Sequence, residues 1–258
     1  HDIAIFPLPI QKEESHNKRR MGLGLTGVAN AGEALGYKYG DEGFLGWYGQ
    51  VLELFRDEVY SASSDLAEEK GSFPLFDAEK YCSSKFIKTL PQWLQDKIKY
   101  QGIRNSHLLS LAPTGTISLC ADNVSGGIEP VFSLFYDRTV QTYDGPTTER
   151  VEDYAYREWG VEGKIASECT AEEHLNVLAL SSEYVDSAVS KTINVSPNMP
   201  WDEFKNIYLK AWELGCKGCT TFNSGGKRFG ILNEIEEEEE ETPEACYIDP
   251  TTGQKECS

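Results

Sequence analysis

The chain has 258 residues, of which 40% are hydrophobic, and its formal net charge is −18. This length suffices for one large domain or two small ones. The strong negative charge argues against a broad binding face for duplex nucleic acid, whose phosphates attract basic side chains. The sequence holds no run of about 18 apolar residues, so we expect no membrane span. Because the first residue is His1 rather than Met, we expect a fragment of a longer protein.

Cysteine usage indicates a reducing compartment. The seven cysteines are odd in number and irregular in spacing, which fits a secreted disulfide scaffold poorly. We therefore expect a cytoplasmic protein. The cysteines are Cys82, Cys120, Cys169, Cys216, Cys219, Cys246 and Cys257.

The N-terminal part of the chain is predicted to be mainly helical. Residues 1–16 read as an entry loop, and residues 17–36 as a glycine-rich helix. Residues 42–70 give the clearest helical pattern, because apolar residues recur at helical spacing and Gly71 supplies a stop. A further helix is expected over 91–100.

Residues 22–27 read Gly-Leu-Gly-Leu-Thr-Gly. This order resembles a dinucleotide-binding fingerprint, but no strand is predicted before it, so it does not indicate a Rossmann site. The glycines at 22, 24 and 27 would instead let this segment pack closely against a neighbour.

The remainder of the chain alternates between strand and helix patterns, which favours an α/β fold. Thr170 and Glu173 form the capping-box pattern of a helix start. Strands are expected over 106–112, 131–143, 191–195 and 216–222, and helices over 147–159, 171–190 and 201–214.

A polar turn follows the first expected strand. Residues 113–118 read Pro-Thr-Gly-Thr-Ile-Ser, and a short helix is expected next. The free N–H groups of that helix start, with the hydroxyls of Thr114, Thr116 and Ser118, would make a cradle of neutral donors for a phosphate. Gly115 lets the backbone approach a ligand closely. The same residues would also make an ordinary N-capped helix start.

A second glycine-rich turn lies at 125–130, Ser-Gly-Gly-Ile-Glu-Pro. Gly126 and Gly127 permit positive φ angles, and Pro130 fixes the exit. Glu129 is either a functional carboxylate or a side chain that caps local backbone N–H groups, and we favour the capping role.

Cys216-Lys-Gly-Cys219 has the spacing of a zinc knuckle or of a redox disulfide. No second Cys/His pair lies at a suitable distance for zinc, so no metal site is predicted. The Thr-Thr-Phe that follows reads as a strand, not as a helix N-terminus that would lower a thiol pKa. We interpret the pair as buried cysteines at a strand start.

A different cysteine pair follows six consecutive glutamates at 236–241, which we expect to be solvated and disordered. Cys246 and Cys257 lie in a tail with Pro250 and Gly253 between them, and a turn there could bring the two sulfurs together. Such a tethered dithiol could visit a buried site and an external reductant in turn. The alternative is a disordered tail with incidental cysteines.

Several stretches together resemble the C-terminal half of the large catalytic subunit of a ribonucleotide reductase. They are NKRRMGLGLTGVANA, KGSFPLFDAEKY, GIRNSHLLSLAPTGTIS, VSGGIEPVF, EYVDSAVSKTINV and GCKGCTTF. The resemblance implies that residues 1–232 form the C-terminal part of a ten-stranded α/β barrel. Residues 233–245 would then be an acidic linker and 246–258 a redox tail. It also implies reduction of ribonucleotides to 2′-deoxyribonucleotides by a thiyl-radical mechanism, for DNA synthesis.

The resemblance further implies roles for individual residues. Cys246 and Cys257 would pass electrons from thioredoxin or a glutaredoxin-type reductant to an active-site disulfide, and Ser125–Pro130 would brace the barrel mouth. The substrate phosphates would be held by Ala112, Pro113, Thr114, Gly115, Thr116, Ile117 and Ser118.

The radical source is indicated by one departure from the family pattern. In the iron- or manganese-dependent class a late strand carries Lys-Thr-x-Tyr-Tyr, whereas Lys217–Phe222 reads Lys-Gly-Cys-Thr-Thr-Phe. Threonine is no redox relay, so the resemblance favours the class II enzymes, which use adenosylcobalamin.

One family motif is missing from the sequence. The finger-loop Asn-Pro-Cys, which carries the radical cysteine, does not occur, so the chain is expected to need an N-terminal half as a partner. Alternatives are a class I large-subunit fragment, a non-catalytic nucleotide-phosphate-binding fragment, or a tethered thiol-redox protein acting through its tail.

Overall fold

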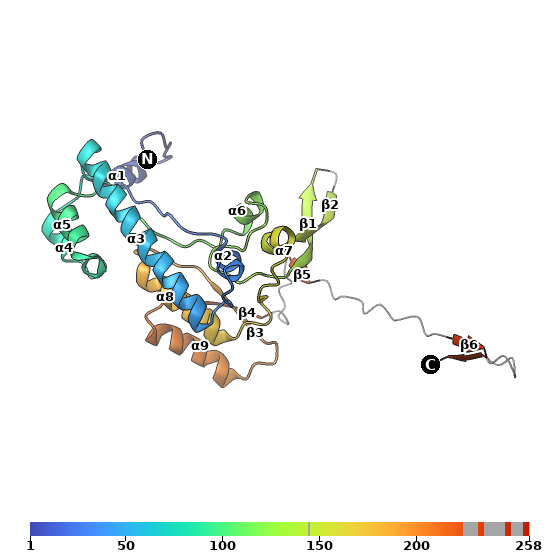
Figure 1. The fold of residues 1–258 in the computed structure, drawn as a ribbon. Helices are drawn as coiled ribbons and strands as arrows, with labels where there is room; N and C mark the ends of the chain where they lie inside the picture. Colours follow the sequence, from blue (N-terminus) through green and yellow to red (C-terminus); the bar gives the residue numbers. More distant parts are fainter. Residues whose placement is uncertain (144, 224–231, 235–245, 249–254, 258) are drawn as a thin grey trace.

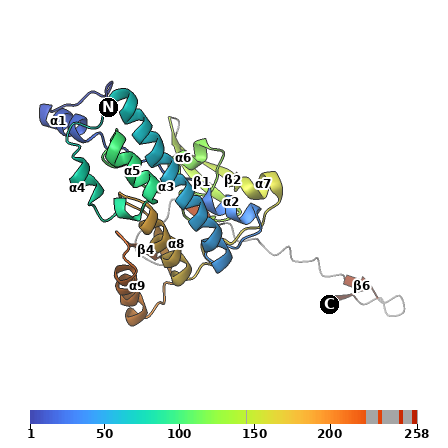
Figure 2. The same ribbon diagram turned by 60° about the vertical axis from the view of Figure 1, so that its left-hand side comes forward.

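The computed structural model describes residues 1–143, 145–223, 232–234, 246–248 and 255–257. Its longest element, α3 (Glu42–Lys70), packs against α5 (Gln92–Gln101) and α8 (Ala171–Tyr184), as Figures 1 and 2 show. The further helices in the described ranges are α1 (Pro9–Lys18), α2 (Val28–Ala34), α4 (Ala78–Cys82), α6 (Gly115–Cys120), α7 (Tyr154–Trp159), α9 (Trp201–Glu213) and the 3-10 helix η1 (Ile87–Thr89).

Helix α3 confirms the prediction over 42–70. The Asp41 carboxylate accepts a hydrogen bond from the Phe44 N–H at 2.7 Å and so caps the first turn. Gly71, with φ 79°, ends the helix. The buried apolar face consists of Phe44, Tyr48, Leu52, Tyr60 and Ala67.

The described strands form three small sheets. In the first, β1 (Phe135–Thr142) lies between β2 (Gly145–Glu152) and β5 (Leu232–Glu234), antiparallel to both. In the second, β3 (Thr192–Val195) and β4 (Thr220–Asn223) pair in parallel. In the third, β6 (Cys246–Ile248) and β7 (Lys255–Cys257) are antiparallel. This mixture agrees with the predicted α/β class, whereas these described strands close no barrel.

Isolated parallel bridges join three extended segments of the chain. Leu23 is bridged to Leu109, and Leu111 to Val189. These bridges replace the strand that is predicted over 106–112. Because Leu109 and Leu111 are buried, the segment is fixed on the core up to the point where the polar turn begins.

The glycine-rich segment packs closely, as predicted, but in an extended conformation. A Cβ added to Gly24 would stand 2.3 Å from the Ser110 carbonyl oxygen. The Leu23 N–H donates to the Leu108 carbonyl at 2.8 Å. The helix predicted over 17–36 is therefore wrong for residues 19–27, because this backbone pairs with a neighbouring segment; residues 17–18 end α1, and the rest of the predicted helix is reduced to α2.

The helix predicted over 147–159 is a strand as far as Glu152. β2 folds back on β1, so that Thr142 faces Gly145 across the hairpin. Gly145, with φ 119°, is the first residue of β2 after the chain has turned back. α7 begins only at Tyr154, after the Asp153 side chain has capped it.

Helix starts were predicted more accurately than the loops beside them. The capping box of Thr170 and Glu173 opens α8, as predicted, although α8 ends at Tyr184. α5 and α9 are confirmed. The loop predicted over 1–16 is wrong from Pro9 onward, because proline takes the first position of α1.

Two hydrophobic cores support these elements. The larger surrounds α3 and includes residues of α5, α8 and the segment 108–111. The smaller lies between α8, α9 and β3 and buries Leu175, Ile193, Val195, Ile207 and Ala211.

Candidate functional site

The predicted phosphate turn is open to solvent where the buried segment 108–111 ends. Thr114 has a left-handed backbone with φ 51°, and α6 begins directly after it. In the described part of the chain, no side chain caps this start, and the N–H groups of Gly115, Thr116 and Ile117 have no acceptor. All three residues are exposed. Free backbone donors therefore face solvent, which is the arrangement that anion binding uses.

The hydroxyls of the turn have two different tasks. Thr114 Oγ1 shares a hydrogen bond of 2.8 Å with Thr26 Oγ1 and accepts one of 2.6 Å from the Gly127 N–H. The buried Ser118 hydroxyl donates to the Gly115 carbonyl at 3.1 Å. These two hydroxyls shape the turn, so the exposed Thr116 hydroxyl is the one left for a ligand.

The second turn is built directly against the first. A Cβ on Gly126 would stand 2.8 Å from the Pro113 carbonyl oxygen, and one on Gly127 would stand 2.6 Å from the Ala112 carbonyl oxygen. Gly127 also has φ 51°. Residues with side chains would push the two turns apart, so glycine is required at both positions.

Helix α2 supports the second turn through a side chain, Asn30, that was not predicted from the sequence. The Asn30 side chain donates to both carboxylate oxygens of Asp153, at 3.0 and 2.9 Å, and its oxygen accepts from the Ser125 N–H at 2.6 Å. Asp153 is buried, and this burial raises the pKa of its carboxyl group. The available signal was a polar residue, Asn30, within the apolar stretch Val-Ala-Asn-Ala.

Glu129 does cap backbone N–H groups, but not the local ones that were predicted. Its carboxylate accepts from the Thr192 N–H at 2.6 Å and from the Lys191 ammonium at 2.8 Å. Lys191 Nζ also lies 5.3 Å from the centre of the Tyr39 ring. Glu129 therefore joins the second turn to the start of β3.

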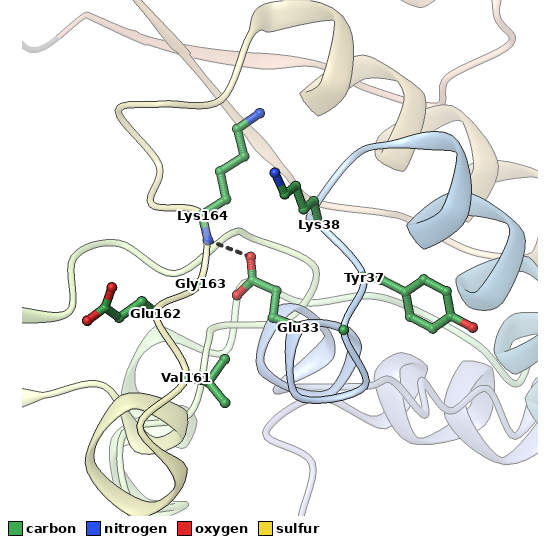
Figure 3. A pocket seen from close by; sticks show the side chains of 8 residues that line it. Glu33, Tyr37, Lys38, Val161, Glu162, Gly163 and Lys164 are labelled. Atoms are coloured by element: carbon green, nitrogen blue, oxygen red, sulfur yellow. Dashed lines mark hydrogen bonds between the residues drawn. The ribbon is translucent and has the colours of Figure 1, made fainter.

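A hollow of about 190 Å³ lies at the C-terminal end of α2, between residues 36–38 and 161–164 (Figure 3). Glu33 accepts from the Lys164 N–H at 2.7 Å, and its other oxygen is buried with no hydrogen-bond partner in the described part. Burial raises the pKa of Glu33 to about 7. None of the residues lining this hollow belongs to the polar turn.

The chain was compared with known protein families. The family model described as "Ribonucleotide reductase, barrel domain" matches residues 1–158 and 163–222. The chain belongs to this family. The match includes the polar turn and the second turn.

Curated relatives are named as ribonucleotide reductases. The chain is 29% identical to the vitamin B12-dependent ribonucleoside-diphosphate reductase of Mycobacterium tuberculosis, over 90% of this chain and 35% of that protein. It is 29% identical to the enzyme of the same name from Thermoplasma acidophilum, over 90% of this chain and 32% of that protein. Ribonucleoside-diphosphate reductase 1 subunit alpha of Escherichia coli is 24% identical, over 84% of this chain and 31% of that protein. The chain thus spans about a third of these relatives.

Four of the seven cysteines of this ribonucleotide reductase family member form two sequence pairs. Cys216 and Cys219 are free, half-buried thiols that pack against both cores. Burial raises the pKa of both thiols, as expected of unreactive cysteines. Cys246 and Cys257 are Cα partners in the antiparallel pair of β6 and β7. The acidic run 236–241 lies outside the described residues.

Strand β4 carries Thr220, Thr221 and Phe222, the residues on which the expectation of a cobalamin-dependent class was based. Thr221 Oγ1 shares a hydrogen bond of 2.8 Å with the Tyr208 hydroxyl, and Phe222 is 39% exposed. In the described ranges, no group of three His, Cys, Asp or Glu side chains could hold a metal ion. No helix there is long and apolar enough to span a bilayer.

Proposed function

We propose that this chain is the C-terminal part of an adenosylcobalamin-dependent ribonucleotide reductase, in which residues 112–118 bind the substrate phosphates. The observation that carries the proposal is the solvent-facing set of free N–H groups at Gly115, Thr116 and Ile117. Membership of the reductase family and the similarity to vitamin B12-dependent enzymes support it.

The turn can recognise a phosphate without a basic side chain. Three backbone N–H groups and the Thr116 hydroxyl can donate hydrogen bonds to the phosphate oxygens. These neutral donors suit a chain with a net charge of −18, which lacks a broad basic surface for binding anions. The cross-braced turns keep these donors in place before the ligand arrives, so little ordering is needed on binding. The role of this site is to hold and orient the nucleotide.

The reduction itself needs two electrons and two protons. A dithiol supplies them and becomes a disulfide, while the 2′-hydroxyl of the ribonucleotide leaves as water. Cys246 and Cys257 suit a dithiol that restores the active-site thiols, because the pairing of β6 with β7 sets the two residues opposite one another. The electrons would come from thioredoxin or a glutaredoxin-type protein in the cytoplasm.

Adenosylcobalamin would supply the radical that starts the reaction. We assign no side chain of this chain to the cofactor. An N-terminal part of the enzyme would contribute the radical cysteine. Thr220 and Thr221 stand where the iron- or manganese-dependent class has tyrosines, which favours cobalamin over a small radical-generating subunit.

The phosphate assignment is tested by Gly115→Ala. An added Cβ would meet no protein atom within 4 Å, so the fold is expected to tolerate it, but the methyl group would occupy the open side of the turn. Gly46→Ala is the matched control, because its Cβ also meets nothing within 4 Å and it lies in α3.

The measurement is the Kd of a ribonucleoside diphosphate and of the nucleoside without phosphate, for this chain combined with its N-terminal part. We expect Gly115→Ala to weaken diphosphate binding about tenfold or more, a loss of at least about 1.4 kcal/mol. The Gly46→Ala protein should bind as the unmodified one does. Equal diphosphate affinity in the two variants would refute the assignment.

The cofactor class is tested by activity. Reduction of the ribonucleotide only when adenosylcobalamin and a dithiol are present would support the adenosylcobalamin-dependent class, and turnover without cobalamin would contradict it.

A further inference from the structure

A lysine is buried next to the second turn. The Lys191 side chain is 0% exposed, and its ammonium group donates to Glu129 Oε2 at 2.8 Å. Removing an ammonium group from water costs several kcal/mol, and a salt bridge often fails to repay that cost. Apolar replacements of buried ion pairs are often neutral or stabilising, so a contribution to stability is weak grounds for such a pair.

The ion pair is connected to the phosphate turn by short contacts. Glu129 donates its own N–H to the Gly126 carbonyl at 2.8 Å, within the second turn. The next residue of that turn, Gly127, donates its N–H to Thr114 Oγ1 at 2.6 Å. Thr114 is the residue whose left-handed backbone sets the direction of the free donors that follow it.

Tyr39, a neighbour of Lys191, also holds the second turn. The Tyr39 hydroxyl donates to the Ile128 carbonyl at 2.5 Å, and the Tyr39 ring lies 5.3 Å from Lys191 Nζ. Ile128 and Glu129 are thus held by two neighbouring side chains, one aromatic and one cationic. A cation over an aromatic face is attracted to it when both are desolvated.

We propose that Lys191 is a positioning residue for nucleotide binding, which acts through Glu129 to hold the second turn against Thr114. The proposal rests on the proposed phosphate site. Lys191 touches no substrate itself. Its charge fixes the direction of the Glu129 carboxylate, and a neutral pair of similar size would leave the second turn free to shift. The effect is therefore on the affinity for the phosphate, not on the chemical step.

The test uses this chain combined with its N-terminal part. The variant Lys191→Met/Glu129→Gln removes both charges at nearly constant volume and leaves no buried charge unpaired. The control is Lys164→Met/Glu173→Gln, which removes a half-buried ion pair of 2.6 Å that lies outside both turns. KM and kcat for the ribonucleotide, the melting temperature, and hydrogen exchange of the peptide 113–130 are measured.

We expect the Lys191→Met/Glu129→Gln protein to have KM raised about tenfold, which corresponds to about 1.4 kcal/mol, with kcat changed less than about twofold. Its melting temperature should stay close to that of the unmodified protein, and the peptide 113–130 should exchange faster. The control should leave KM and this peptide unchanged. An unchanged KM in the folded Lys191 variant overturns the proposal, as does an equal rise in the control.

If the double variant does not fold, Lys191→Met alone is measured, because the Glu129 carboxylate is 23% exposed and still accepts from the Thr192 N–H, so that the fully buried charge is the one removed. An unchanged KM in that variant overturns the proposal. If the unmodified protein binds no ribonucleotide, or if Gly115→Ala leaves binding intact, the proposed phosphate site fails, and the role of Lys191 falls with it.

Discussion

Thr26 and Thr114 stand 88 positions apart in the chain, yet their hydroxyl oxygens share a hydrogen bond of 2.8 Å. The Gly127 N–H reaches both of them, at 2.6 Å to Thr114 and 3.2 Å to Thr26. Thr26 also donates to the Ser125 carbonyl at 3.1 Å. Three segments of the chain therefore meet at this pair of hydroxyl groups, and one of the two, that of Thr114, belongs to the polar turn itself.

Replacing Thr26 by valine tests this meeting point. The substitution keeps the shape of the side chain and removes its hydroxyl, so the hydrogen bonds to Thr114 and to the Ser125 carbonyl are lost. We expect the free energy of unfolding to fall by about 1 kcal/mol in urea denaturation. Thr114→Ala should cost more, about 2 kcal/mol, because the Gly127 N–H then loses its shorter bond. Equal stability of Thr26→Val and the unmodified chain would contradict this account.

Gly24→Ala tests the close approach of the extended segments. The new Cβ would stand 2.3 Å from the Ser110 carbonyl oxygen, and a backbone atom cannot move aside as a side chain can. We expect a loss of about 3 kcal/mol in unfolding free energy, at the upper end of the usual cost of overpacking. Gly46→Ala, in an open position of α3, should instead be neutral or slightly stabilising. Similar effects of the two substitutions would show that the segments do not pack in this way.

His174→Leu tests the pH dependence of stability. Burial, with the nearby Lys191 charge, lowers the pKa of His174 from 6.5 to about 3. Both ring nitrogens are buried without a partner in the described residues. As pH falls below about 6.5, the unfolded chain takes up a proton here that the folded chain refuses, so stability is lost.

The expected loss from this one group between pH 7 and pH 5 is about 2 kcal/mol. His174→Leu should flatten the curve of unfolding free energy over that interval by a similar amount, which urea titrations at each pH would measure. An identical slope in the variant and the unmodified chain would show that His174 does not carry this effect.

Glu33→Gln is expected to act in the opposite pH direction. Burial raises the pKa of Glu33 from 4.5 to about 7, so the folded chain holds a proton that the unfolded chain releases. Stability from this group is present at low pH and lost as pH rises through about 7. We expect Glu33→Gln to remove a loss of about 2 kcal/mol between pH 5 and pH 8. Glu162→Gln, an exposed neighbour in the same hollow, should leave the slope unchanged, and an equal effect there would argue against a special role for Glu33.

The sequence was a good guide where local signals decide the structure. The start of α8 is set by Thr170 and Glu173, which lie within one turn of each other, and the stop of α3 is a single glycine. The polar turn was also found, because Pro113 and Gly115 mark the end of an apolar run whatever lies around it. Its free N–H groups are as predicted, although two of its three hydroxyls are used internally.

The predictions failed where the conformation of a segment depends on a partner that is distant in the sequence. Residues 17–27 have a helix-compatible pattern, but Gly22 and Gly24 lie against Ser110, and that neighbour is visible only in the fold. Likewise Thr147 and its neighbours read as a helix until β1 is placed opposite them. Thr26 and Asn30 support the site across about 90 residues of chain, so no spacing rule could have found them.

Helix α2 holds two separate parts of the chain. It has seven residues; Asn30 holds Ser125 and Asp153, and Glu33, three residues later, holds the Lys164 backbone. In evolutionary terms, positions 30 and 153, whose side chains bond to each other, should therefore be replaced together or not at all among relatives. A loop inserted between 153 and 164 would have to spare both attachments, so a change of length is expected only between them, away from Asp153 and Lys164.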